Sequence, residues 1–500
     1  MDVSHLLSVI LFLPLAGGVA CLAFRRNPRA CRRFALGVAL ADLGLVLLLY
    51  LRAMAGPAAR GFLIVEDHSW IESLGARYSL GADGISLLLV TLTAFLGVLS
   101  ILASWKQIEE RVALFHFFLL FTQTGILGVF FATDLLLFYL FWELQLIPIF
   151  FIIGIWGHGN RIFATVKFVM FSIAGSLLML AALIGLYLVH GAKTGNYTFG
   201  LFDLMGTPLS PFVEVLLYSA FVLAFGIKIP LFPVHTWLPD AHTEAPTAGS
   251  VILAGLLLKT GAYAVLRLGF PLFPQAAHRS FPVLMVLGLI GIFYAAWIAL
   301  AQKDMKRLIA YSSIGHMGLI VFGLAAWNAI TVSGAVVQMV NHGLTTSALF
   351  IMAGMVDERT RTRELADLGG MWKSMPVFGA FFLLFAMSTA GLPGLNNFIG
   401  EILILAGAFK AWPGAAMIGF AGIVFALVYV LRLVQDTLYG QPRKVFELWD
   451  VTGREALILV PLAFLVLLIG FYPGPLLGLL QGPIQNLLGI TETVMTASAW

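Results

Sequence analysis

Long apolar runs constrain this chain more than any other feature of its sequence. Fourteen such runs are present, and a helix of about 20 apolar residues is enough to cross the hydrocarbon core of a bilayer. Charged residues make up only 11% of the sequence, compared with roughly 25% in soluble domains. The sequence therefore predicts an all-α polytopic membrane protein. The expected spans are residues 4–24, 34–54, 82–104, 113–131, 134–155, 163–190, 213–238, 246–267, 283–301, 308–326, 331–354, 376–409, 414–438 and 456–474. The tail after Pro475 is amphipathic and too interrupted to predict a further span.

The distribution of basic residues orients these spans. With the amino terminus outside, 18 of the 29 Lys and Arg residues fall in inner loops and 7 in outer segments, and such an excess is typical of cytoplasmic loops. The basic cluster at residues 25–33 follows the first apolar run, which indicates a retained span rather than a cleaved signal peptide. With no transit peptide expected either, this pattern favours a bacterial plasma membrane. The four remaining basic residues are predicted inside the membrane, as are three acidic ones: Lys167, Lys228, Lys259, Arg432, Asp42, Glu143 and Glu401.

Two spans are interrupted by proline, and they lie five spans apart. The seventh contains residues 228–233, which read KIPLFP, and the twelfth contains residues 388–394, which read STAGLPG. An odd offset gives the two units opposite orientations, and inverted repeats with matching broken helices are typical of transporters. A proline kink facing lipid is the simpler alternative for each break.

Six titratable residues are expected near the middle of the membrane, each on a different helix. They are Glu143, Lys228, Lys259, His316, His342 and Glu401. A charged side chain at this depth costs several kcal/mol unless it is paired or hydrated. A buried amine without an acid partner favours its neutral form, and histidine changes charge near neutral pH. The set is therefore suited to proton transfer, with internal water expected to bridge the gaps between helices.

We assign a provisional role to each member of this set. Glu143 and Lys228 are expected to form a modulating ion pair, and Lys259 to be the central carrier. His316 and His342 would be relays, and Glu401 the terminal acceptor. Structural alternatives stay open: a static ion pair, hydrogen-bonded core histidines, or a carboxylate that caps freed backbone N–H groups. Lys167, Asp42 and Arg432 are better explained by pairing or snorkelling.

The sequence contains no motif for a redox cofactor, metal or nucleotide. Cys21 and Cys31 flank a basic loop and form no CxxC or Cys/His cluster, which argues against iron–sulfur and zinc sites. No GxGxxG or Walker-type loop follows a strand. The net charge of +4 gives no reason to expect nucleic-acid binding, because charge distribution matters more than the sum in a membrane protein.

Six stretches of the sequence together form a distinctive set. They are FWELQLIPIF at 141–150, KIPLFPVHTWLPDAHTEAPTAGS at 228–250, LLLKTGAY at 256–263, KRLIAYSSIGHMG at 306–318, NHGLTTSALFIMAGMVDERTRTR at 341–363 and LPGLNNFIGEILILAG at 392–407. These stretches resemble the proton-conducting, antiporter-like subunits of respiratory complex I, the proton-translocating NADH:quinone oxidoreductase. Within this family, DAHTEAPTAGS is similar to the M-type subunit rather than the L- or N-type. Glu401 agrees with this assignment, since the L-type carries lysine at the matching place.

The resemblance implies a fold and a set of partners. It implies fourteen helices with two inverted five-helix repeats, at residues 113–267 and 283–438, between helices 1–3 (residues 1–112) and a last span with its tail (residues 456–500). It also implies that the six residues above line a proton path, with His235 a further candidate beside the first break. NADH, FMN, iron–sulfur clusters and quinone would be bound by partner subunits, and L- and N-type subunits would be neighbours in the membrane.

Three other functions stay open at this point. A subunit of a multisubunit cation/proton antiporter would share the fold and predict sodium-dependent exchange. A subunit of a membrane-bound hydrogenase or a related complex would have partners with a nickel–iron centre. A non-conducting helical scaffold is disfavoured, because it has no need of six buried titratable groups.

Overall fold

The structure is a bundle of helices with one short β-hairpin. The computed structural model describes residues 5–55, 62, 64–441, 444 and 446–497. Its α-helices are α1 (Leu6–Cys21), α2 (Pro28–Ala55), α3 (Gly84–Gln107), α4 (Val112–Phe131), α5 (Leu135–Leu144), α6 (Leu146–Trp156), α7 (Arg161–Thr194), α8 (Leu201–Leu204), α9 (Pro211–Lys228), α10 (Trp237–Glu244), α11 (Thr247–Ile252), α12 (Leu258–Ala264), α13 (Phe270–Leu272), α14 (Pro274–Leu300), α15 (Met305–Ala325), α16 (Ala329–Thr360), α17 (Met371–Ser374), α18 (Pro376–Thr389), α19 (Asn396–Phe409), α20 (Pro413–Leu438), α21 (Gly453–Phe471) and α22 (Gly474–Ala497). Two 3₁₀ turns, η2 (Leu22–Phe24) and η3 (Glu72–Leu74), two π-helical segments, η4 (Leu253–Leu257) and η5 (Val265–Gly269), and the antiparallel strands β1 (Ile64–Ile71) and β2 (Ala76–Ala82) complete the fold.

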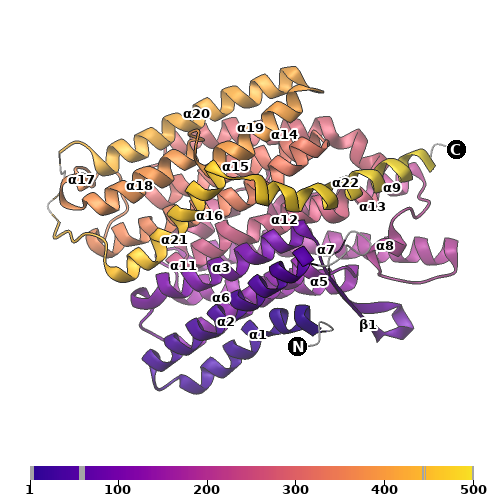
Figure 1. The fold of residues 1–500 in the computed structure, drawn as a ribbon, viewed down its shortest axis with the longest axis horizontal. Coiled ribbons are helices and arrows are strands. Elements are labelled where there is room, and N and C mark those ends of the chain that lie inside the picture. Colours follow the sequence, from indigo (N-terminus) through magenta and orange to yellow (C-terminus); the bar gives the residue numbers. More distant parts are fainter. Residues whose placement is uncertain (1–4, 56–61, 63, 442–443, 445, 498–500) are drawn as a thin grey trace.

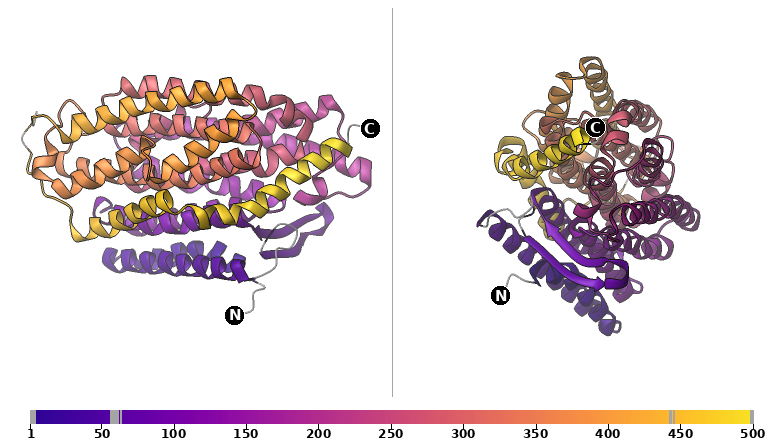
Figure 2. Two further views of the ribbon diagram at one scale, coloured as in Figure 1. Left: turned by 45° about the horizontal axis from the view of Figure 1, so that its top comes forward. Right: turned by 90° about the vertical axis from the view of Figure 1, so that its right-hand side faces the viewer.

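The helices agree with the predicted spans. In the described residues, 13 helical segments are long and apolar enough to cross a membrane. The twelfth predicted span is present as two shorter apolar helices, α18 and α19, so the fourteen predicted segments are all accounted for. Most long helices run along the longest axis of the molecule, side by side (Figures 1 and 2). The prediction of an all-α polytopic membrane protein is confirmed. The division into repeats at 113–267 and 283–438 stays a prediction.

The two ends of the bundle carry different elements. The β-hairpin and the end of α22 lie at one end, and α17 lies at the other (Figure 1). We call the hairpin end the outer end, since the predicted topology places its loops outside. Arg60 and Arg443, which entered the charge count, lie outside the described residues.

A carboxylate fixes the hairpin to the first helix. The first-turn N–H groups of α1 have no side-chain cap within their own segment. Glu66 of β1, which lies far away in the sequence, supplies this cap. Its carboxylate accepts hydrogen bonds from the N–H groups of Leu7 (2.6 Å) and Ser8 (3.1 Å) and from the Ser8 hydroxyl (2.5 Å). Because unsatisfied N–H groups at a helix start need such partners, Glu66 ties the outer hairpin to the bundle.

Both predicted helix breaks are present. Residues 229–236 separate α9 from α10, and residues 390–395 separate α18 from α19. At the second break Gly391 and Gly394 have φ of +72° and +90°, a region that L-residues with a side chain rarely adopt. The eighth span is irregular in a different way, since it passes from α11 through η4, α12 and η5. π-Helical turns of this kind frequently lie at functional sites.

The tail after the last span forms a helix of its own. The 24-residue α22 contains Pro483 and is not among the segments apolar enough to span a membrane. In Figure 2 it runs slantwise across the outside of the bundle toward the hairpin end. The prediction that this tail is not a span agrees with the structure.

Asp134 is expected to stabilise the outer end of α5. Its carboxylate accepts hydrogen bonds from the N–H groups of Leu136 (2.9 Å), Leu137 (3.0 Å) and Arg77 (3.0 Å). Loss of such a cap costs about 0.5–2 kcal/mol, so Asp134→Ala should lower the melting temperature of the purified protein in detergent. Asp67→Ala is the control, because its ion pair with Arg77 is about 40% exposed and is worth ~1 kcal/mol at most. Equal melting temperatures for the two variants would contradict this interpretation.

Candidate functional site

Lys259 and His342 contact each other in the centre of the protein. Both side chains are fully buried, and Lys259 Nζ lies 2.6 Å from His342 Nδ1. Lys259 Nζ also donates to the carbonyl oxygen of Ala254, in the π-helical segment η4. No acidic side chain of the described residues forms an ion pair with it. Here the expectation that water bridges the helices is wrong, since the two side chains touch.

Two glycines allow this contact. A Cβ on Gly343 would lie 3.0 Å from the carbonyl oxygen of Gly255, so α16 and η4 approach each other backbone to backbone. Gly343 follows His342, and Gly255 precedes Lys259 by about one turn. Side chains at either position would separate the helices, so this approach sets the distance between lysine and histidine.

His316 and Glu401 continue the line of titratable groups. The His316 and His342 rings are 5.5 Å apart between centroids. His316 Nδ1 lies 3.9 Å from Glu401 Oε1, and both side chains are 6% exposed. Lys259, His342, His316 and Glu401 thus form a consecutive series on α12, α16, α15 and α19, which we call the central series.

A small cavity adjoins the Glu401 end of the central series. It has a volume of about 20 Å³ and is lined by His316, Glu401 and Tyr429, among other residues, which is room for about one water molecule. Tyr429 of α20 is buried and lies beside Ser312, within electrostatic reach of Glu401. Tyr429 could not be singled out from the sequence, because an aromatic residue in an apolar span has no distinguishing signal.

The second break is held against α16 by polar side chains. Asn341 Nδ2 donates to the carbonyl oxygen of Asn396 (2.6 Å), and Ser388 Oγ donates to Asn396 Oδ1 (2.5 Å). Thr345 Oγ1 lies 3.2 Å from Ser388 Oγ. Irregular backbone at membrane depth persists only where such partners satisfy it. Asn341 and Thr345 flank His342 on α16, so the same helix face positions both the break and the central series.

Glu143 and Lys228 lie together but do not form a direct ion pair. Lys228, at the end of α9, places Nζ 4.6 Å from the centroid of the Trp142 ring. Its Nζ and Glu143 Oε1 both lack a hydrogen-bond partner among the described residues. The Glu143 charge acts on Lys228 from beyond contact distance. The predicted ion pair is therefore open in this structure, because the ammonium group rests on the aromatic face instead.

His235 lies apart from the central series. It belongs to the first break and is buried between Phe232, with ring centroids 5.7 Å apart, and Tyr294 of α14, at 4.9 Å. Its Nδ1 has no partner among the described residues. The structure therefore places six of the seven candidates in two groups, the central series and the Glu143–Lys228 pair, and His235 in neither.

Two further buried basic groups were not singled out from the sequence. His242 of α10 stacks on Phe350 at 4.7 Å, and both its ring nitrogens lack partners in the described chain. Lys306 was predicted in an inner loop, but it is 1% exposed and donates to the carbonyl oxygen of Ala245 at 2.8 Å. Lys306 and Lys259 both act electrostatically on His242. The sequence feature that could have identified His242 is its position within the stretch DAHTEAPTAGS at residues 240–250.

The remaining charges inside the membrane are paired. Lys167 contacts Asp240 at 2.8 Å, and Arg432 contacts Asp436 at 3.4 Å. Gln123 donates to Asp42 at 2.7 Å. These contacts agree with the structural interpretation given to Lys167, Arg432 and Asp42. Among the described residues, no group of three or more His, Cys, Asp or Glu side chains is arranged to hold a metal ion.

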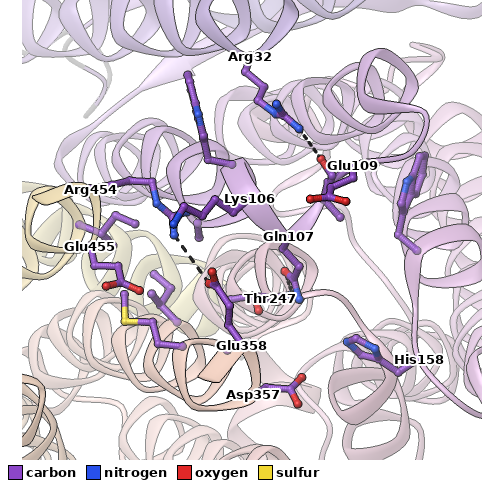
Figure 3. A pocket seen from close by; sticks show the side chains of 18 of the residues that line it. Arg32, Lys106, Gln107, Glu109, His158, Thr247, Asp357, Glu358, Arg454 and Glu455 are labelled. Atoms are coloured by element: carbon purple, nitrogen blue, oxygen red, sulfur yellow. Dashed lines mark hydrogen bonds and ion pairs between the residues drawn. The ribbon is translucent and has the colours of Figure 1, made fainter. Parts of the chain in front are cut away.

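A large charged cavity opens at the inner end. Its volume is about 980 Å³, and Figure 3 shows acidic and basic side chains around it. Arg454 pairs with Glu358 at 3.8 Å, and the N–H of Thr247 donates to Gln107 Oε1 at 3.1 Å. Burial, followed by Lys306 and Arg363, lowers the pKa of His158 in its wall to about 4. Thr247 begins the helical run that leads to Lys259, so the cavity lies at the start of that run.

Comparison with known proteins identifies the family. Residues 132–426 match the family described as NADH:quinone oxidoreductase/Mrp antiporter, TM, and residues 57–133 match NADH-ubiquinone oxidoreductase chain 4, amino terminus. NADH-quinone oxidoreductase subunit M of Pseudomonas aeruginosa is 44% identical over 483 residues, which are 94% of each chain. This chain belongs to the NADH-quinone oxidoreductase subunit M family. The resemblance stated from the sequence motifs is thereby confirmed.

Solved structures give the same fold. A chain of respiratory complex I from Thermus thermophilus with bound NADH superimposes with a TM-score of 0.87 and 31% identity, covering 96% of this chain and 99% of that one. A chain of the Mrp complex from Dietzia sp. DQ12-45-1b gives a TM-score of 0.86 at 20% identity and full coverage of both chains. The Mrp likeness establishes the shared fold alone.

Gly391 is expected to be intolerant of a side chain. Its φ is +72°, and an added Cβ would lie 2.1 Å from Glu401 Oε2. Gly391→Ala should therefore displace Glu401 in addition to the backbone strain of about 1–2 kcal/mol. Gly394→Ala is the matched control, since φ is +90° but its Cβ would meet only Phe471 at 3.4 Å. We expect a larger fall in melting temperature for Gly391→Ala; an equal fall would show that Glu401 is not held by this contact.

Proposed function

We propose that this chain is a proton-translocating membrane-arm subunit of NADH-quinone oxidoreductase. The observation that carries the proposal is the central series, Lys259–His342–His316–Glu401, which joins four helices. Its three steps are 2.6 Å from Lys259 Nζ to His342 Nδ1, 5.5 Å between the histidine ring centroids, and 3.9 Å from His316 Nδ1 to Glu401 Oε1. The family supplies the reaction to which the series is coupled. Electron transfer from NADH to quinone would occur in partner subunits.

The central series has the features that proton transfer requires. Each member can bind or release a proton, and Nε2 of both histidines lacks a partner among the described residues. A histidine that accepts a proton at one ring nitrogen and releases it from the other acts as a relay. Lys259 is the carrier, because no acidic partner among the residues that the structure describes fixes its charge. Glu401, next to the small cavity and Tyr429, would receive the proton at the other end.

Glu143 and Lys228 would control the series from one side. The open pair leaves Lys228 stabilised by Trp142 rather than by a carboxylate. A Cβ on Gly261 would lie 3.0 Å from the carbonyl oxygen of Phe225, so α12 packs closely against α9 near Lys228. Closing the Glu143–Lys228 pair would withdraw positive charge from the neighbourhood of Lys259. Removing positive charge favours the protonated form of Lys259, so the pair acts as a switch for proton loading.

We place the source of protons at the inner cavity. It carries carboxylates and a histidine, and it reaches Thr247, the first residue of α11. The cofactors NADH, FMN and iron–sulfur clusters, together with quinone, would be bound elsewhere in the complex. Subunits of the L and N types would be the neighbours of this chain in a bacterial plasma membrane.

The alternative of a cation/proton antiporter subunit is less well supported. Its support is the description of the family that matches residues 132–426, which covers NADH:quinone oxidoreductase and Mrp antiporter alike, and the Mrp likeness, which at 20% identity concerns the fold alone. The relative at 44% identity is named for NADH-quinone oxidoreductase. Proton uptake that requires sodium, measured in vesicles with and without added sodium, would favour the antiporter instead.

Lys259→Met should abolish proton transfer while keeping the volume of the side chain. We expect NADH-driven proton uptake into inverted membrane vesicles and NADH oxidation to fall together by roughly 100-fold or more, since a general acid–base group typically contributes about 10²–10⁴-fold. The physical reason is that His342 would then have no proton donor at Nδ1.

Lys303→Met is the control for that substitution. Lys303 is an exposed lysine of the inner loop before α15, and its loss should leave both rates within twofold of the wild type, as is usual for exposed residues. Assembly of each variant is checked by native gel electrophoresis. An assembled Lys259→Met complex with wild-type proton uptake would refute the proposed role of the central series.

A further inference from the structure

The outer end of the helix that carries Lys259 is closed by a polar cluster with no role so far. It consists of four residues from two segments of the chain. Asp83 caps the start of α3 and Ser86 lies in its first turn, while Tyr263 lies in α12 and Arg267 in η5. The Arg267 guanidinium group contacts the Asp83 carboxylate, and their side chains are 9% and 1% exposed. Arg267 Nε also donates to the Tyr263 hydroxyl at 3.3 Å.

The hydrogen bonds of Tyr263 are all in use. Its hydroxyl donates to the carbonyl oxygen of Phe130 at 3.0 Å and lies 3.0 Å from Ser86 Oγ. With its own proton given to Phe130, the oxygen accepts from Ser86 and Arg267, which fills both lone pairs. No side-chain atom of this cluster is among the unpartnered buried atoms, whereas Lys228, His242, His316 and His342 all contribute one or more. The Tyr263 hydroxyl therefore has no lone pair left with which to accept a further proton.

The cluster lies on the direct route from Lys259 to the outside. Tyr263 and Arg267 follow Lys259 by four and eight residues, which places them about 6 and 12 Å further along the helix. Arginine stays charged in proteins, so Arg267 does not release a proton, and its buried ion pair with Asp83 occupies this end of the helix. A proton that moved outward along this helix would have to pass both residues.

Outer elements cover the cluster from water. The Phe62 ring lies 5.0 Å from the Arg267 guanidinium carbon. A Cβ on Gly84 would collide with the carbonyl of Leu479, so α22 packs directly on the start of α3. The inner end of the same helical run, by contrast, begins at the wall of the large charged cavity (Figure 3). Access to Lys259 is therefore asymmetric.

We propose that Asp83, Ser86, Tyr263 and Arg267 form an outer seal that stops protons from returning along the Lys259 helix. The inference rests on the proposed function, in which Lys259 exchanges protons with the inner side and with His342. The competing explanation is structural: a buried ion pair that only joins α3 to the eighth span. The chain contains a matched pair at the inner end that separates the two explanations.

That matched pair is Arg359 and Glu455. Arg359 binds Glu455 through two hydrogen bonds of 3.0 and 2.8 Å, both side chains are buried, and Trp449 lies 5.0 Å from its guanidinium carbon. The Arg359–Glu455 pair joins α16 to α21, in the same way as the Arg267–Asp83 pair joins the eighth span to α3. A purely structural role predicts the same consequence for neutralising either pair, whereas a seal predicts proton leakage for the outer pair alone.

The test is the passive proton permeability of the whole complex in liposomes, without NADH. An acid pulse is applied with the membrane potential clamped by potassium and valinomycin, and an internal dye reports pH. Asp83→Asn with Arg267→Gln removes both charges but keeps a residue that caps helices well. We expect this double variant to raise proton permeability about tenfold, because it breaks the hydrogen bonds between Arg267, Asp83 and Tyr263 that keep water out of this end of the helix; a tenfold change corresponds to about 1.4 kcal/mol in the barrier. Two control variants should stay as tight as the wild type. One is the single variant Arg267→Lys, and the other is the inner double variant, Glu455→Gln with Arg359→Gln.

Two results would overturn the seal. One is an assembled outer double variant as tight as the wild type, and the other is equal leakage from the inner double variant. Adding Lys259→Met to the leaky variant should restore tightness; continued leakage would show a route that bypasses Lys259. If the outer double variant does not assemble, Tyr263→Phe tests the same cluster, with a smaller leak expected and wild-type tightness contradicting the proposal. Because no NADH is used, failure of the seal is distinguishable from failure of redox-driven pumping.

Discussion

The cost of placing ionisable groups in hydrocarbon governs this structure. A lysine at the centre of a membrane costs about 2.5–3.5 kcal/mol even on insertion scales, yet Lys228 and Lys259 are both almost completely buried. The fold meets this constraint by directing these side chains into the bundle, onto Trp142 in one case and onto His342 and Ala254 in the other. Because buried groups such as Lys228 and His342 keep atoms without a hydrogen-bond partner among the described residues, they can still exchange a proton.

The broken helices follow from the same constraint. A continuous helix uses its backbone groups internally, while a break frees them for side chains and ions. The first break begins directly after Lys228, and the second brings the backbone of Gly391 against the Glu401 carboxylate. Asn396 and Ser388 then bind the second break to the helix face that carries His342. The breaks, the central series and the inner cavity are thus parts of one polar interior, with Arg267 and Asp83 closing its outer end.

Much of the fold and of the candidate site could be predicted from the sequence, and there are physical reasons why the rest could not. Spans and buried charges were readable because hydropathy reports depth directly, which is why Lys259, His316, His342 and Glu401 were found. Their contacts were not readable, since the distance between Lys259 and His342 depends on backbone approach at Gly255 and Gly343. Lys306 and Arg267 lie at the ends of apolar runs and were counted as loop charges, although both are buried.

The most direct test of the account asks whether the central series acts as one path. His342→Gln, Glu401→Gln and the double variant would be compared by NADH-driven proton uptake in inverted vesicles, with assembly confirmed for each. Groups that act in series are strongly non-additive, so the double variant should lose no more activity than the more affected single variant. If the two losses multiply instead, His342 and Glu401 act independently, and the continuous path from Lys259 to Glu401 is contradicted.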